Sequence, residues 1–386
     1  MRVLVCTNAM FGHFTPLVPL ATSLGYRDHD VLVATEPGFS EQVRSHGLDH
    51  RGVGRDLTLD DLFGVLPDIF EVSPEDQDAY ARPRVFIELR AMNVIDDMQE
   101  LVTSWRPDVV VRESAELASW AVAERHGVPH VAVNVGAGTS TNQWEAMARP
   151  WIDRLGSRIG LDALDASSMY RYGLLSFEPA GYHDWTDTPT ASVYRPSPVS
   201  VGQHLTKEVA ALDARPIVYV TLGTEFYNEA LMRSIIAALA DGDWNVVATT
   251  GLAHDPAAVD PVRANVVVAR WIPQDAILDR AAAVVSHAGA GTVVGCLVRG
   301  LPSVCVPQGA DQFHHARRVE ELGAGISLAV TDREPVAILQ AVTSILSDGS
   351  YRSRAMQLAA ETAQLPNLDT AILRVEQLAS QRPAAR

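Results

Sequence analysis

The sequence predicts an α/β protein made of two doubly wound domains, each a parallel sheet with helices on both faces. The chain has 386 residues, about twice the usual length of one domain. Short apolar strands alternate with helical segments in its first third, and the alternation restarts after a proline-rich stretch over residues 188–216. Such alternation is typical of parallel sheets, because the crossover helices cover both faces.

In the N-terminal half, short apolar runs predict buried strands, and apolar residues at helical spacing predict the helices between them. The predicted strands are Val3–Cys6, Val31–Ala34, Val109–Val111 and His130–Val133. The predicted helices are Thr15–Leu24, Phe39–His46 and Ala115–His126. Gly47 and Gly127 directly follow the last two helices, where glycine commonly ends a helix.

The C-terminal half repeats this organisation. Its predicted strands are Ile217–Thr221, Asn245–Thr249, Val266–Ala269, Ala283–Ser286 and Ser303–Val306. Its predicted helices are Glu229–Ala240, Asp275–Arg280, Thr292–Arg299, Arg352–Ala363 and Thr370–Ser380. We therefore expect an N-terminal domain over residues 1–200, a linker over 201–216, a C-terminal domain over 217–365, and a last helix within 366–386 that returns to the N-terminal domain.

Composition excludes several classes of function. The formal net charge is −16, whereas a nucleic-acid binder needs a basic face. No run reaches the ~18 apolar residues of a membrane span, and the apolar N-terminus is too short for a signal peptide. The three cysteines lie in apolar runs without CxxC or metal-ligand spacing. We expect reduced thiols, no metal site and a cytoplasmic protein.

An anion-binding loop is predicted where strand Ala283–Ser286 meets the next helix. Gly289, Ala290 and Gly291 separate the strand from the helix that Thr292 begins. Glycines let the backbone approach a ligand closely, and a helix N-terminus offers unpaired N–H groups and partial positive charge. The segment can therefore hold a diphosphate without a metal ion.

The same loop approximates a dinucleotide fingerprint, which leaves a nicotinamide- or flavin-dependent dehydrogenase as an alternative. Three neighbouring features argue against it. His287 stands before the turn, where a dinucleotide fold needs a small residue. Trp271-Ile-Pro-Gln274 lies upstream, and Asp311-Gln312 follows a Pro-Gln-Gly-Ala loop.

These motifs, taken in order, resemble the donor-binding signature of family 1 glycosyltransferases, and of bacterial antibiotic and macrolide glycosyltransferases in particular. The matching segments are Trp271–Leu278, His287–Thr292, Gly300–Pro302, Pro307–Gln312, Thr221–Thr224 and Gly12-His13-x-x-Pro16. The resemblance spans most of the chain. It implies a GT-B fold, in which two Rossmann-like domains face each other across a cleft that holds the active site. It also implies a dTDP- or UDP-sugar as co-substrate and no required cofactor.

The resemblance assigns the donor site to aromatic, polar and glycine residues of the C-terminal domain. An indole offers a flat face to a nucleobase, imidazole and hydroxyl groups donate to phosphate, and carboxylate and amide groups bind sugar hydroxyls. The assigned residues are Trp271 for the base, Gln274 for the ribose, Thr224, His287, Gly289, Ala290, Gly291 and Thr292 for the diphosphate, and Asp311 and Gln312 for the sugar. The structural alternative for Asp311 is a helix cap.

One departure from the family pattern bears on the nucleotide. Plant members carry a glutamate three residues after the position of Thr292, where it contacts the ribose hydroxyls. Gly295 stands there in this chain. Loss of that contact favours a deoxyribose donor, so we expect a dTDP-deoxysugar in preference to a UDP-sugar.

The catalytic base is expected at His13, which follows the first strand at its carboxyl end, where doubly wound sheets bind ligands. A neutral imidazole can take a proton from an acceptor hydroxyl near pH 7. By the resemblance, an acidic residue after a later strand orients this base. The family usually has Asp there, and this chain has Glu113. Asp108 is a weaker alternative because it precedes the strand. The implied reaction is an inverting displacement without a metal ion.

Aromatic residues outside the two sheets suggest a large apolar aglycone, with Phe63, Phe86 and Trp144 as candidate acceptor contacts. The alternative is that these side chains only pack on the sheet. Two other functions stay open on the same fold: a nucleotide-sugar epimerase and a non-catalytic partner protein. The sequence carries no signal of oligomeric state, and a homodimer is left open.

Overall fold

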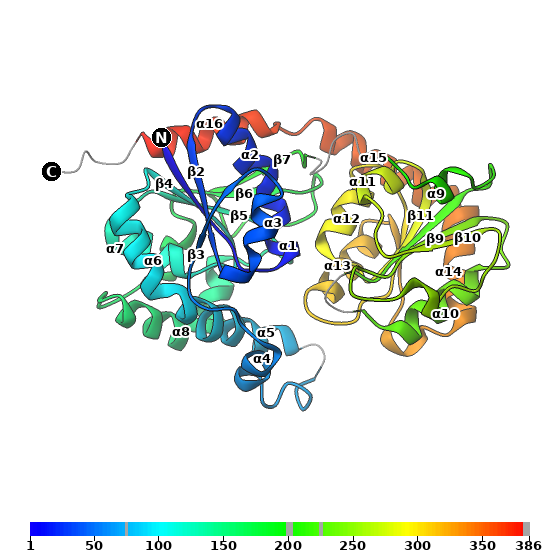
Figure 1. Cartoon of the computed structure of the whole chain (residues 1–386), viewed down its shortest axis with the longest axis horizontal. Helices are drawn as coiled ribbons and strands as arrows, with labels where there is room; N and C mark the ends of the chain where they lie inside the picture. Colours follow the sequence, from blue (N-terminus) through cyan, green and yellow to red (C-terminus); the bar gives the residue numbers. More distant parts are fainter. Residues whose placement is uncertain (74–75, 198–203, 224–226, 381–386) are drawn as a thin grey trace. The chain divides into compact units, whose positions relative to one another are not determined.

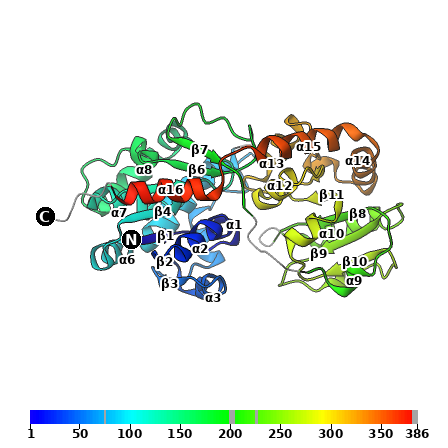
Figure 2. The ribbon, with the colours of Figure 1, turned by 90° about the horizontal axis from the view of Figure 1, so that it is seen from above.

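The computed structural model describes residues 1–73, 76–197, 204–223 and 227–380. The chain divides into two compact units. Unit 1 comprises Met1–Phe177, His183–Val199 and Pro366–Arg386, and unit 2 comprises Glu178–Tyr182 and Ser200–Leu365. Figures 1 and 2 show that each unit has its own sheet with helices around it.

The described residues of unit 1 form a seven-stranded parallel sheet in the order β3-β2-β1-β4-β5-β6-β7. The strands are β1 (Arg2–Cys6), β2 (Asp30–Thr35), β3 (Asp49–Gly52), β4 (Val109–Glu113), β5 (His130–Val133), β6 (Leu174–Phe177) and β7 (Ala191–Tyr194). Strand β1 pairs with β2 on one side and with β4 on the other. The strand order reverses between β1 and β4, which is the point where such sheets bind ligands.

The helical segments of unit 1 cover both faces of this sheet. They are α1 (Phe11–Phe14), η1 (Thr15–Leu17), α2 (Val18–Tyr26), η2 (Pro37–Phe39), α3 (Ser40–Arg44), α4 (Leu59–Val65), α5 (Gln77–Pro83), η3 (Arg84–Ala91), α6 (Met92–Trp105), α7 (Ala118–His126), α8 (Thr141–Arg158), η4 (Ala166–Tyr170) and α16 (Leu368–Ala379). Leu4 and Cys6 of β1 face the core under α6, α7 and α8. Val3 and Val5 face the opposite core, under α2 and α16. The near-continuous apolar β1 is therefore buried on both sides.

Helix α16 belongs to unit 1, although it is the last element of the described chain. It lies alongside α2 in Figures 1 and 2. Ile372 and Val375 of α16 are buried in the unit 1 core. At the surface, Arg27 pairs with Asp369 at 2.7 Å. These contacts attach the end of the chain to the unit that contains its beginning.

The described residues of unit 2 form a six-stranded parallel sheet in the order β10-β9-β8-β11-β12-β13. The strands are β8 (Ile217–Thr221), β9 (Asn245–Thr249), β10 (Val266–Ala269), β11 (Ala281–Ser286), β12 (Ser303–Cys305) and β13 (Gly325–Ser327). The register places Thr221 of β8 opposite Ser286 of β11. The strand order reverses between these two strands, so the loops after Thr221 and Ser286 leave the sheet side by side.

Helical segments also cover both faces of the second sheet. They are α9 (Lys207–Ala210), α10 (Glu229–Leu239), η5 (Pro256–Ala258), α11 (Gln274–Leu278), α12 (Ala290–Leu297), α13 (Gln312–Glu321), η6 (Val330–Asp332), α14 (Pro335–Ser347) and α15 (Gly349–Ala363). Val218 and Val220 of β8 pack with α10 and α14. Ile217 and Tyr219 pack with α11 and α12 on the other face.

The proline-rich stretch over residues 188–216 is more structured than a plain linker. Strand β7 lies inside it and pairs in parallel with β6, and the short helix α9 follows. Residues 178–182 were expected in the N-terminal domain, but they belong to unit 2.

Within the described ranges, no helix combines the length and apolarity that crossing a membrane requires.

Candidate active site

His13 and Glu113 meet at the reversal point of the first sheet. His13 lies in α1, directly after β1, and Glu113 is the last residue of β4. The Nδ1 atom of His13 lies 2.9 Å from Oε1 of Glu113. The alternative partner, Asp108, precedes β4 and accepts a hydrogen bond from the backbone N–H of Arg2. It is therefore at the opposite end of the strand from His13.

The carboxylate of Glu113 is fully buried and held by three donors. Besides His13, the side-chain amide of Asn8 donates to Oε1 and the backbone N–H of Ala115 donates to Oε2, each at 2.5 Å. Burial by itself raises the pKa of Glu113, but the charge and hydrogen bond of His13 and the bonds from Ala115 and Asn8 outweigh it. The net pKa is lowered. The carboxylate is therefore ionised at neutral pH and can stabilise an imidazolium.

A buried arginine supports the turn that follows Glu113. Arg112 is fully buried, and its Nη1 donates to the backbone carbonyls of Glu113, Ser114 and Glu116 at 3.2–3.4 Å. Its Nη2 donates to the carbonyl of Met169 at 2.7 Å. The Glu113 carbonyl also accepts from the backbone N–H of Glu116 at 3.1 Å, so Arg112 reinforces a turn that already has one backbone hydrogen bond.

Of the three predicted acceptor residues, Phe86 is the one with a ring contact to His13. The ring centroid of Phe86 lies 5.4 Å from that of His13. Phe63 is 49% exposed on α4 and stacks on Phe70. Trp144 is only 1% exposed and packs in the core under α8. Its predicted acceptor contact does not fit this burial, because the indole has no surface left to offer a ligand.

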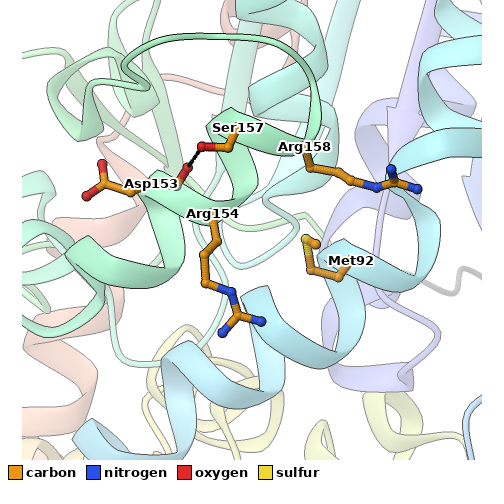
Figure 3. A pocket seen from close by; sticks show the side chains of 5 residues that line it. All are labelled: Met92, Asp153, Arg154, Ser157 and Arg158. Atoms are coloured by element: carbon orange, nitrogen blue, oxygen red, sulfur yellow. Dashed lines mark hydrogen bonds between the residues drawn. The ribbon is translucent and has the colours of Figure 1, made fainter.

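Unit 1 also contains two hollows. One, of about 210 Å³, is lined by Ala9, Glu36, Phe39, Arg90 and neighbours, next to the loop that carries His13. The other, of about 520 Å³, lies between α6 and α8 around Met92 (Figure 3). Its two arginines are paired with acidic residues of unit 1, and it shares no residue with the His13–Glu113 pair. We therefore assign it no part in the site.

In unit 2, Trp271 and Gln274 lie before and at the start of α11. Trp271 is 56% exposed, which is unusual for so large an apolar side chain and suits a residue that stacks on a ligand. The side-chain amide of Gln274 donates to Oγ1 of Thr292 at 2.9 Å. Because this bond uses Thr292 as an acceptor, the hydroxyl hydrogen of Thr292 can still be donated to a phosphate oxygen.

His287 follows β11 and is closely confined. A Cβ atom added to Gly223 or to Gly289 would lie 2.6 or 2.4 Å from His287 Nε2. Within the described residues, its buried Nδ1 has no hydrogen-bond partner. Burial lowers the pKa of His287 to about 4, against smaller opposing effects of Thr221 and Asp311. The ring is therefore neutral at pH 7, and it can act as a hydrogen-bond donor rather than as a fixed charge.

The glycine loop joins His287 to α12. Ala288 has a left-handed backbone with φ of 63°, and Gly289 precedes the helix as its N-cap. Gly289 has no side chain with which to cap the first N–H groups of α12, so those of Ala290 and Gly291 are suited to an anion. No sequence motif predicts this left-handed alanine, because residues other than glycine and asparagine rarely adopt the conformation.

Asp311 and Gln312 lie at the start of α13, in the first two positions after the loop. The side chain of Asp311 is 29% exposed, and its Oδ2 lies 3.2 Å from Nε2 of His315. Gln312 is buried, and its Oε1 accepts from the backbone N–H groups of Gln308 and Gly309. Gln312 therefore holds the loop that leads to Asp311.

The described part of the chain brings the predicted site residues together in two groups. His13 and Glu113 form one group in unit 1, and the residues from Trp271 to Gln312 form the other in unit 2. Thr224 lies outside the described residues. Asn8 and Arg112 were not predicted, because no local motif marks a residue that supports a distant carboxylate. Across the described ranges, no cluster of three or more histidine, cysteine or acidic side chains could hold a metal ion.

Two family models match the chain, one in each half. The N-terminal domain model of erythromycin biosynthesis protein CIII-like proteins matches residues 23–167, and the C-terminal domain model matches residues 233–378. The first match includes β4 with Glu113, and the second includes the loops between Trp271 and Gln312.

Curated relatives are similar over almost their whole length. An L-demethylnoviosyl transferase of Streptomyces niveus is 30% identical over 375 residues, with 95% of each chain covered. A 10-deoxymethynolide desosaminyltransferase of Streptomyces venezuelae is 27% identical, with 100% of this chain and 99% of the relative covered.

Solved structures share the fold. The glycosyltransferase VinC in complex with dTDP matches with a TM-score of 0.81 and 23% identity, covering 99% of this chain and 100% of that one. The calicheamicin glycosyltransferase CalG4 matches with a TM-score of 0.82 and 22% identity, covering 99% of each. The predicted GT-B fold of two Rossmann-like domains is therefore confirmed.

Proposed function

The chain belongs to the bacterial natural-product glycosyltransferases that the erythromycin biosynthesis protein CIII-like models describe, and from this we propose its reaction. We propose that it is an inverting, metal-independent glycosyltransferase. In this proposal it moves a deoxysugar from a dTDP-sugar to a hydroxyl group of an apolar natural-product aglycone. The single observation that carries the proposal is the pairing of His13 with a fully buried Glu113 at 2.9 Å.

We assign His13 the role of general base. In the proposed step its Nε2 takes the proton of the acceptor hydroxyl, while Nδ1–H donates to Glu113. The imidazolium that forms lies against a buried carboxylate, which stabilises the positive charge in surroundings of low dielectric constant. Glu113 keeps its negative charge throughout, and the donors from Asn8 and Ala115 keep it in place.

We assign the donor to unit 2. The exposed indole of Trp271 would stack on the nucleobase, and Gln274 would lie near the ribose. The diphosphate would accept hydrogen bonds from the His287 ring, from the Thr292 hydroxyl and from the first N–H groups of α12. Asp311 would accept from sugar hydroxyls, while Gln312 keeps its loop in position.

In the proposed displacement, the acceptor oxygen forms a bond to the anomeric carbon as the bond from that carbon to the diphosphate oxygen breaks. A single displacement inverts the anomeric configuration. The leaving dTDP gains negative charge, and the donors at the start of α12 point at that charge. Preorganised donors of this kind can do the work that a metal ion does in other enzymes.

The choice of dTDP rests on two observations. Gly295 provides no side chain for a ribose 2′-hydroxyl. A similar structure, VinC, holds dTDP. The choice of a deoxysugar rests on relatives whose names refer to demethylnoviosyl and desosaminyl transfer. The choice of aglycone rests on the second of these names, which gives 10-deoxymethynolide as the acceptor. It also rests on the Phe86 ring beside His13.

The test is a transfer assay. The purified chain is incubated with matched dTDP- and UDP-sugars and a panel of polyketide, macrolide and aminocoumarin aglycones, with and without EDTA. We expect a sugar-sized mass gain on the aglycone, faster with dTDP-sugars, with an inverted anomeric centre by NMR and no effect of EDTA. Loss of activity in EDTA would overturn the proposed metal independence, and a retained anomeric configuration would overturn the proposed inversion. A preference for UDP-sugars would overturn the choice of dTDP. Epimerisation without an acceptor would indicate the other reaction open to this fold.

A further inference from the structure

Three side chains at helix α13 form a hydrogen-bonded triad, which consists of Tyr182, His315 and Asp311. His315 lies one helical turn after Asp311, and its Nε2 lies 3.2 Å from Asp311 Oδ2. Its Nδ1 lies 2.7 Å from the hydroxyl of Tyr182. The two rings are stacked, with centroids 5.9 Å apart and an angle of 20° between their planes. The imidazole therefore bridges a phenol and a carboxylate.

The chemistry of the three groups fixes the direction of these bonds. Tyr182 is 1% exposed, and burial, with the negative charge of nearby groups, raises the pKa of its phenol. The phenol therefore keeps its proton and can donate it to His315 Nδ1. Because a carboxylate can only accept, the Nε2 atom of His315 carries the hydrogen of its bond to Asp311. That hydrogen points at Asp311.

The backbone of Tyr182 is anchored to the same helix. Arg318 of α13 donates from Nε to the carbonyl of Tyr182 and from Nη2 to that of Gly181, each at 2.6 Å. The backbone N–H of Ala180 donates to Thr362 of α15 at 3.0 Å. This explains why residues 178–182 belong to unit 2, although the chain on both sides of them belongs to unit 1. Both ends of Tyr182, its backbone and its hydroxyl, are thus fixed relative to Asp311.

We propose that Tyr182 and His315 are positioning residues for the sugar of the donor, because their hydrogen bonds hold the Asp311 carboxylate ready to accept from sugar hydroxyls. The proposal rests on the proposed function, which places the donor sugar at Asp311. A carboxylate that is already oriented loses less rotational freedom when the sugar binds. The Tyr182–His315–Asp311 triad includes no residue that we assign to the nucleotide. We therefore expect it to affect binding of the sugar and not binding of dTDP.

The test compares binding of dTDP with binding of dTDP-sugars by calorimetry. The ligands are dTDP, dTDP-glucose and dTDP-4-keto-6-deoxyglucose, and the variant is Tyr182→Phe, which removes only the hydroxyl. Loss of one hydrogen bond predicts about three- to tenfold weaker binding of the preferred dTDP-sugar. Binding of dTDP alone should stay within about twofold, because the base and diphosphate sites are untouched.

Tyr219→Phe is the matched control. Tyr219 is also buried in unit 2, and its hydroxyl pairs with Thr249 at 2.8 Å. Its removal should leave the ratio of dTDP-sugar to dTDP affinity unchanged, even if it lowers the melting temperature. A purely structural role for Tyr182 would give the same result as this control.

Two variants of His315 separate positioning from packing. His315→Gln keeps an N–H donor on the side chain and should retain part of the sugar selectivity, whereas His315→Leu should lose it. In the His315→Leu background, Tyr182→Phe should have no further effect on the ratio of dTDP-sugar to dTDP affinity, because the hydrogen bonds of the triad are already lost. In the transfer assay, the same variants should raise KM for the dTDP-sugar more than they lower kcat.

The outcomes distinguish this proposal from the proposed function. An unchanged affinity ratio in Tyr182→Phe and His315→Leu, with normal transfer by the wild type, overturns the positioning roles and leaves the proposed function standing. A wild-type chain that binds dTDP but gains no affinity from any attached sugar overturns the positioning roles as well, since no sugar subsite would then exist. Failure of the wild type to transfer sugar at all overturns the proposed function.

Discussion

The imidazole of His287 occupies the space that a side chain at position 289 would need. A Cβ atom added to Gly289 would lie 2.4 Å from His287 Nε2 and 2.9 Å from Cε1. Gly223, at the end of the neighbouring strand, closes the other side of the ring. The two glycines are therefore required because the ring lies against their backbones, in addition to any contact with a ligand.

We predict that Gly289→Ala displaces the His287 ring. Because the ring is confined on both sides, the overpacking should lower the free energy of unfolding by about 1–3 kcal/mol, and dTDP binding should weaken. Gly291→Ala is the comparison for stability, since a Cβ at Gly291 meets nothing within 4 Å. That change should raise the free energy of unfolding by about 0.5–1 kcal/mol, as alanine favours a helix. Equal effects of the two changes in urea unfolding would contradict the confinement.

The same confinement predicts a pH dependence of stability. The pKa of His287 is about 4 in the folded chain and about 6.5 in an unfolded one. Between these values the unfolded chain binds a proton that the folded chain does not. The stabilisation is therefore complete above about pH 6.5 and is lost as the pH falls toward 4, by up to about 3 kcal/mol.

The measurement is the difference in unfolding free energy between the wild type and His287→Gln from pH 7.5 to 4. Taking the difference cancels the other titrating groups, including Glu116, whose pKa burial raises to about 7. The advantage of the wild type should shrink steadily below pH 6.5. A constant difference across this range would mean that His287 is not protected from protonation.

Most strands of the two sheets could be predicted, because they are short apolar runs that are buried on both faces. His130–Val133, Ile217–Thr221 and Asn245–Thr249 were predicted with their observed bounds, since a continuous apolar run leaves little choice of where the strand ends. Four of the described strands were not predicted: β6 (Leu174–Phe177), β7 (Ala191–Tyr194), β13 (Gly325–Ser327) and β3 (Asp49–Gly52). Strand β3 shows one reason. It is a polar edge strand whose position is determined by pairing with β2, and its own residues show no alternation.

Residues of the candidate site could be named from the sequence where they belong to a local motif, and not where a distant contact brings them together. The glycine loop and the Asp311-Gln312 pair are local, so their residues could be named from the sequence. The support of Glu113 by Asn8 joins residues 105 positions apart, and the bond from Tyr182 to His315 spans 133. No spacing rule predicts such pairs, because the fold alone brings them together.

The length of Glu113 leads to a third prediction. The family usually has Asp at this position, yet Glu113→Asp should impair this chain. The shorter side chain withdraws the carboxylate by about 1.5 Å, out of reach of His13, Asn8 and the N–H of Ala115 at once. We expect kcat to fall by about 10–100-fold, less than the roughly 100–10,000-fold contribution of a whole general base, because His13 itself remains.

Glu113→Gln is the companion variant, since it keeps the length and loses the charge, and we expect a similar loss of kcat from it. Binding of dTDP should be unchanged in both, because the proposed nucleotide site is in unit 2. The pairing would be contradicted by full activity of Glu113→Asp or of Glu113→Gln in the transfer assay.

The loop before Asp311 contains a strained residue that yields a last prediction. Ala310 is exposed and has a left-handed backbone with φ of 52°. That conformation costs a residue with a Cβ about 1–2 kcal/mol, while glycine in its place loses about 0.5–1 kcal/mol more backbone entropy on folding. Ala310→Gly should therefore raise the free energy of unfolding by about 0.5–1 kcal/mol. Ala230→Gly, at an exposed position in α10, should instead lower it by about 1 kcal/mol. Because the two variants make the same chemical change, opposite signs in urea unfolding can come only from the backbone conformation, and a loss of stability in both would show that Ala310 is not strained.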